Sequence, residues 1–114
     1  MYRVFDESGN SPNSIVNHLN VFGYMLYLNH KIRKFHDIYC GMTNDLDETL
    51  ARHKIKSYLC VIDCGSKDKA ATVESKMDDL GYDIGNPPHD ANGAREGSKY
   101  VYLFMKTAES DPAL

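Results

Sequence analysis

The chain has 114 residues, 13 basic and 16 acidic side chains and a formal net charge of −3, with 42% hydrophobic residues. This length predicts one domain with a core of its own, and the acidic balance argues against a general nucleic-acid-binding surface. The longest apolar run, residues 22–28, is far short of the roughly 20 residues that cross a bilayer.

The three cysteines are an odd number and do not have the spacing of a zinc finger. The amino terminus also lacks the apolar core of a signal peptide. Together with the short apolar runs, these features predict a cytoplasmic protein with no membrane contact.

Residues 1–20 are predicted to form an N-terminal edge segment, Tyr2 to Phe5, followed by a loop of turn-forming residues. The domain proper is expected to span residues 21–106, and residues 107–114 to form a flexible tail. The aromatic and aliphatic run at 21–28 predicts a buried strand. A basic hairpin connection is then expected to lead into a second, antiparallel strand that begins at Ile38.

The second half of the chain alternates between helical and strand patterns. A helix is predicted from Leu46 to Lys56, capped by Asn44 or Asp45. Residues 58–64 predict a third strand and residues 66–80 a second helix ending at Gly81. An irregular, mobile loop at 85–98 and a last strand at 99–106 complete the order β-β-α-β-α-β. The predicted fold class is α+β, a small mainly antiparallel sheet with helices packed on it.

Two polar side chains fall on apolar helical faces. His53 lies within about 60° of Leu46 and Leu50 on the first predicted helix. Glu74 lies about 40° from Ala70, at the edge of the apolar stripe of the second helix. A carboxylate at this edge needs a partner, a cation or water.

The segment from Val21 to Leu80 resembles the GIY-YIG nuclease domain. The most specific part is Tyr39-Cys40-Gly41 followed by Asn44-Asp45-Leu46 and His53, with Ala70-x-x-x-Glu74 in the next helix. Gly23 matches part of the first signature, but Met25 stands where the family has a tyrosine.

The resemblance implies hydrolysis of DNA phosphodiesters with Mg²⁺ or Mn²⁺ as cofactor. Tyr39 and His53 would act as the base toward water, Glu74 would hold the metal, Tyr27 would replace the missing phenol and Arg52 would stabilise charge imperfectly. The residues expected to contact DNA are basic: Lys31, Arg33, Lys34, Lys54 and Arg95.

Thr49 occupies the position of the family's arginine, so such an enzyme would be slow. The alternative is a catalytically inactive module that binds nucleic acid or a protein partner, as a regulator or inhibitor of, for instance, phage or mobile-element origin. Catalysis requires Tyr39, His53 and Glu74 to converge on one face within about 10 Å. It also predicts that Thr49→Arg raises the rate of cleavage.

Overall fold

The computed structural model describes residues 4–29, 37–52, 59–84 and 99–106. In chain order its elements are β1 (Val4–Asp6), α1 (Pro12–Asn29), β2 (Ile38–Thr43), α2 (Leu46–Arg52), β3 (Leu59–Asp63), α3 (Lys67–Asp79) and β4 (Tyr100–Met105). This arrangement confirms the α+β fold class. None of the described helices combines the length and the apolar character needed to span a bilayer.

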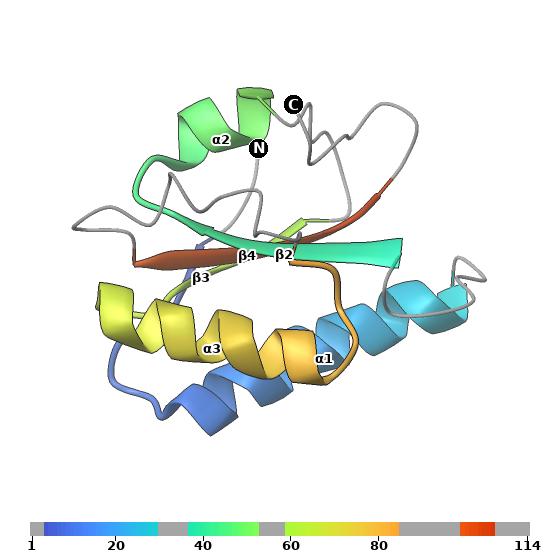
Figure 1. The fold of residues 1–114 in the computed structure, drawn as a ribbon, viewed down its shortest axis with the longest axis horizontal. Helices are drawn as coiled ribbons and strands as arrows, with labels where there is room; N and C mark the ends of the chain where they lie inside the picture. The colour runs from blue at the N-terminus through green and yellow to red at the C-terminus, as the bar shows by residue number, and fades with distance from the viewer. Residues whose placement is uncertain (1–3, 30–36, 53–58, 85–98, 107–114) are drawn as a thin grey trace.

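The strands form one sheet in the order β1-β3-β4-β2. β1 runs parallel to β3, whereas β4 is antiparallel to both β3 and β2, so the sheet is mainly antiparallel. Helices α1 and α3 cover one face of this sheet, and α2 lies over the other face (Figure 1). The last strand therefore lies in the middle of the sheet and contributes to both faces.

The predicted strand at 21–28 is wrong, because these residues form the second half of α1. Ser11 caps this helix, its hydroxyl accepting a hydrogen bond from the Ser14 amide, and Pro12 suits the first turn. Buried residues then recur at helical spacing, at Ile15, Leu19 and Leu26. The sheet position next to β2 that the hairpin required is filled by β4 instead.

The element order is therefore β-α-β-α-β-α-β rather than β-β-α-β-α-β. The boundary expected between residues 20 and 21 falls inside α1, and β1 pairs with β3. Residues 4–29 are thus part of the same packed unit as the rest of the described chain. The predictions for the basic connection, the loop at 85–98 and the tail lie outside the described residues.

Other boundaries agree with the local sequence signals. Asp45 caps α2 by accepting a hydrogen bond from the Glu48 amide at 3.1 Å. Ser66 caps α3 by accepting one from the Lys69 amide, and Gly81 follows that helix with φ +103°. A positive φ suits glycine because it has no Cβ, so the predicted end of this helix is confirmed.

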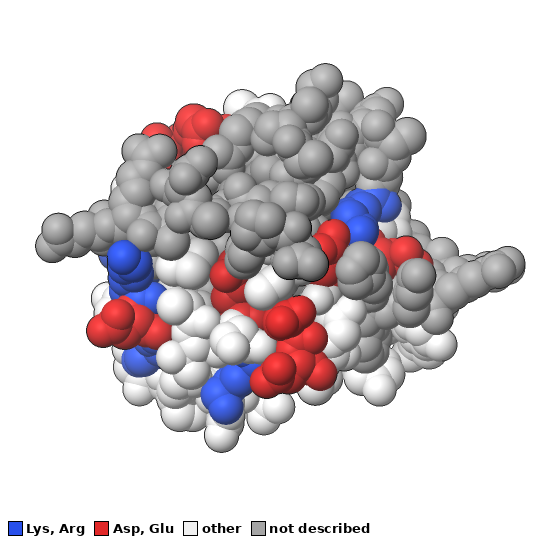
Figure 2. Space-filling model, viewed as in Figure 1, with Lys and Arg blue, Asp and Glu red and all other residues white. Residues whose placement is uncertain are grey.

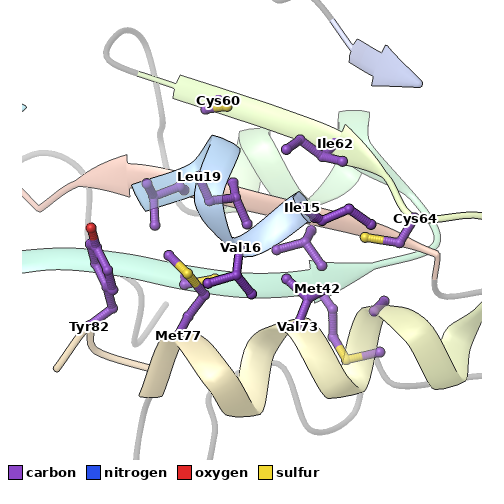
Figure 3. Close-up of a cluster of buried hydrophobic side chains, with 14 of the residues drawn as sticks. Ile15, Val16, Leu19, Met42, Cys60, Ile62, Cys64, Val73, Met77 and Tyr82 are labelled. Carbon is purple, nitrogen blue, oxygen red and sulfur yellow. The ribbon is translucent and has the colours of Figure 1, made fainter. Parts of the chain in front are cut away.

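Buried side chains form two clusters, one on each face of the sheet. The larger cluster lies between the sheet and helices α1 and α3, and Figure 3 shows its side chains interdigitating between these elements. The smaller, aromatic cluster lies on the α2 face and consists of Tyr39, Leu46, Val61, Tyr102 and Phe104. Alternation along β2 explains the division, because neighbouring residues of a strand point to opposite faces.

Tyr82, which follows α3, contacts two residues of α1. The Tyr82 hydroxyl donates a hydrogen bond to the Asn20 Oδ1 atom at 2.6 Å. The Tyr82 ring also lies against Gly23, where an added Cβ would be only 2.8 and 2.9 Å from two ring carbons and closer still to the hydroxyl. Gly23 is therefore needed for close helix packing in this structure, and it does not belong to a strand.

Candidate functional site

Tyr39 lies in the middle of the aromatic cluster. Its ring centroid is 5.5 Å from that of Phe104 and 6.2 Å from that of Tyr102, and none of the three side chains is exposed. Packed aromatic rings at these separations stabilise one another beyond the burial of their area. A phenol enclosed in this way has no access to an attacking water, so Tyr39 is held as a core residue in this structure.

Thr49 is also closed off from solvent, with an exposed fraction of 0%. Its hydroxyl lies 2.8 Å from that of Thr43, which also accepts a hydrogen bond from the Asp45 amide. These contacts tie α2 to the end of β2. The position at which the resemblance expects an arginine thus holds a small, fully buried residue that is hydrogen-bonded to Thr43.

Glu74, which the helical angle placed at the edge of the apolar stripe, is buried, with an exposed fraction of 9%. It lies on α3 beside Val73 and Met77, which pack in the larger cluster. α3 and Tyr39 are on opposite faces of the sheet, so the predicted convergence of Tyr39 and Glu74 is wrong (Figure 1). The spacing along the chain placed Glu74 correctly on its helix but did not determine which face the helix covers.

The other predicted catalytic residues do not complete a site in the described part of the chain. Tyr27 is an exposed residue of α1, not a strand neighbour of Tyr39. Arg52 ends α2, and the structure describes its backbone only. His53 and the proposed DNA contacts lie outside the described residues: Lys31, Arg33, Lys34, Lys54 and Arg95.

The resemblance implies a divalent metal held by Glu74. Within the described ranges, no three His, Cys, Asp or Glu side chains are grouped so that they could hold an ion. Mg²⁺ is bound through carboxylate oxygens together with several waters, which requires an open polar site. Glu74 is a buried residue of α3, between helix positions whose side chains pack in the larger cluster.

The cysteines behave as small apolar residues. Cys40, Cys60 and Cys64 are all free and buried in the larger cluster, and Figure 3 labels Cys60 and Cys64. Burial raises the pKa of the Cys60 thiol from 9.0 to about 12, with the charge of Glu7 adding to the effect. Burial likewise raises the pKa of Cys64 to about 12, with Asp63 and Glu7 contributing. The thiols therefore stay protonated and unreactive in the folded chain.

We expect no thiol to react with Ellman's reagent at pH 8 until the chain unfolds. A thiol pKa raised by folding also means that the unfolded chain loses its thiol protons first, so stability should fall as the pH rises above about 9. Urea titrations from pH 8 to pH 10.5 should show this fall. The double variant Cys60→Ala, Cys64→Ala should show a smaller fall, and rapid labelling of the folded chain would contradict the burial.

The surface of α1 carries an apolar stripe. The stripe was not identified from the sequence, because these residues were predicted to form a strand. Val21, Tyr24, Met25 and Leu28 follow the spacing i, i+3, i+4 and i+7 and are exposed, from 49% at Tyr24 to 71% at Leu28. Tyr27 flanks the stripe, its ring in an edge contact with that of Tyr24 at 6.3 Å. The signal was present in the sequence as a helical period over residues 12–29.

This helix also lacks acidic residues, Lys and Arg, and its His18 pairs with Glu7. Pro12–Asn29 contains no Asp, Glu, Lys or Arg, although a quarter of the whole chain is charged. Its inner face is buried against the sheet and α3 through Ile15, Leu19 and Leu26. Single exposed apolar residues are normal on a folded domain, whereas a contiguous group of them is typical of an interaction surface.

Comparisons of the chain with protein-family models, with curated proteins and with solved structures found no match. The residues that can act on another molecule are therefore identified from the geometry alone, and the α1 stripe is the strongest candidate among the described residues.

Proposed function

We propose that this chain is a catalytically inactive domain that works by binding a protein partner through the exposed stripe of α1: Val21, Tyr24, Met25 and Leu28. The observation that carries the proposal is the contrast between two regions. Tyr39 and Thr49 are fully buried, whereas the apolar stripe of α1 is exposed to solvent and carries no charged residue. A partner of matching chemistry presents an apolar surface with few charges.

A relation to the GIY-YIG superfamily is part of this proposal and rests on the strand-to-helix segment from Ile38 to Arg52. In this interpretation the domain has kept that segment and lost the catalytic arrangement. An intracellular location belongs to the same proposal and is supported by three buried cysteines that form no disulfide.

A protein partner is favoured over DNA by the distribution of charge. Figure 2 shows carboxylates gathered over the C-terminal part of α3, where Asp78 and Asp79 are exposed. The carboxylates at this end of α3 do not favour phosphates, and the stripe of α1 has no cation to attract them. Exposed aliphatic and aromatic side chains without charges are typical of the centre of a protein interface.

The loss of catalysis predicts that the purified chain does not cleave DNA. Supercoiled plasmid, single-stranded DNA and branched DNA are each incubated with the chain and Mg²⁺ or Mn²⁺. The extent of cleavage should not exceed that in buffer without the chain. Contaminating nuclease is recognised because its activity separates from the chain on gel filtration, and Glu74→Gln tests whether activity that elutes with the chain needs this carboxylate. Metal-dependent cleavage that Glu74→Gln abolishes would overturn the proposal of an inactive domain.

Binding through the stripe is tested by photo-crosslinking in cells that produce the chain. A benzophenone amino acid at position 24 or 28 should give the same discrete covalent adduct, because both positions lie on one helical face. The same group at Ala71, an exposed position of α3, is the matched control and should not give it. The adduct should disappear when Met25→Glu is also present, and its absence from positions 24 and 28 would refute the proposal.

A further inference from the structure

The methionines of the described chain differ widely in their exposure to solvent. Met42 and Met77 have exposed fractions of 3% and 0%, and Met105 is partly buried against the larger cluster. Met25, on the outer face of α1, has an exposed fraction of 52%. Because oxidation of a methionine requires contact between its sulfur and the oxidant, Met25 is the described methionine that a dissolved oxidant reaches first.

The cysteines do not compete for such an oxidant. Thiols react with peroxides as thiolates, and only where they are accessible. Cys40, Cys60 and Cys64 are buried, and burial raises the pKa of Cys60 and Cys64 to about 12. Within the described ranges, the oxidisable sulfur that is open to solvent is therefore that of Met25.

Met25 also lies where oxidation has a large effect on the stripe. Tyr24 is its neighbour, and Val21 and Leu28 are one helical turn away on either side. Oxidation converts the apolar thioether into a polar sulfoxide, whose oxygen accepts hydrogen bonds from water. A partner with an apolar surface offers no donor to this oxygen, so binding would bury it without a hydrogen bond, which costs free energy. The same stripe then disfavours the partner that it bound before.

We propose that Met25 is a redox-sensitive modification site, at which oxidation to the sulfoxide by hydrogen peroxide releases the partner from the stripe of α1. This inference rests on the proposed function and adds its regulation. A lone pair of the Met25 sulfur attacks one peroxide oxygen, and the S–O bond forms as the O–O bond breaks. The proton on the transferred oxygen passes to the departing hydroxide, which leaves as water. Sulfur loses two electrons and the peroxide gains them, and cellular reductases can reverse the change.

Limited oxidation of the full chain with hydrogen peroxide, followed by tryptic mass spectrometry, tests the site. Trypsin places Met25 in the peptide of residues 4–31, apart from every other methionine. That peptide should gain one oxygen at least about tenfold faster than the peptides that contain Met42 and Met77. In denaturing urea the three rates should become equal, because burial causes the difference. Equal rates in the folded chain would overturn the inference.

The effect on binding is tested with the purified chain carrying benzophenone at position 28. The chain is oxidised until Met25 is converted, freed of peroxide and added to an extract of the cells in which the unoxidised chain gives its adduct, so that the partner itself never meets the oxidant. The oxidised chain should lose most of the adduct. Treatment with methionine sulfoxide reductase should restore it, because the sulfoxide returns to the thioether. A loss that the reductase does not reverse would come from other damage and would overturn the inference.

The outcomes separate this inference from the proposed function. An adduct that is lost on oxidation of Met25 and regained on its reduction supports both. An adduct that forms equally well with the oxidised chain supports the proposed function and overturns the inference. The absence of any stripe-dependent adduct from the unoxidised chain overturns both.

Discussion

Thr49→Arg should destabilise the fold by about 3 kcal/mol or more and should not create a nuclease. The Thr49 side chain is fully buried, and its hydroxyl lies 2.8 Å from that of Thr43. A guanidinium at this position has to displace packed side chains and lacks a buried counter-charge among its described contacts. The resemblance to a nuclease predicts the opposite result, namely a gain in the rate of cleavage.

Urea unfolding followed by circular dichroism measures this effect, with two controls. Ala51→Arg places the same side chain on an exposed position of α2 and should change stability by less than about 0.5 kcal/mol. Thr49→Val removes the hydroxyl at nearly constant volume and should cost about 1 kcal/mol. A stable Thr49→Arg variant that cleaves DNA would show that α2 opens readily and would restore the catalytic interpretation.

Gly23→Ala should destabilise the fold by about 2–3 kcal/mol, although replacing glycine by alanine inside a helix normally stabilises it by up to about 1 kcal/mol. The reversed sign comes from the Tyr82 ring, two carbons of which would lie 2.8 and 2.9 Å from the new methyl group. Moving the ring away also strains the hydrogen bond from the Tyr82 hydroxyl to Asn20.

A double-mutant cycle with Tyr82→Phe isolates this contact. Tyr82→Phe removes the atom closest to the new methyl group, so the double variant should be more stable than the sum of the single effects by about 1 kcal/mol or more. Gly9→Ala is the control glycine, since an added Cβ there meets nothing within 4 Å. Additive effects of Gly23→Ala and Tyr82→Phe would mean that the new methyl group does not clash with Tyr82, which would contradict this prediction.

Several local features could be read from the sequence because short-range interactions determine them. The caps at Asp45 and Ser66 are side chains that bond to amides three residues later. Gly81 ends α3 because only glycine adopts a positive φ at little cost. The angle between neighbouring residues of a helix placed Glu74 at the edge of the apolar stripe of α3.

Only the tertiary structure decided the rest. Taken alone, the run FGYMLYL suits a buried strand as well as a buried helix; the structure places it in α1, and β4 occupies the sheet position beside β2. Helical periodicity placed Glu74 at the edge of the apolar stripe but could not show which face of the sheet α3 covers. Because α3 packs opposite α2, Glu74 and Tyr39 are separated by the sheet itself. The same long-range packing buried one face of α1 and left its apolar stripe exposed.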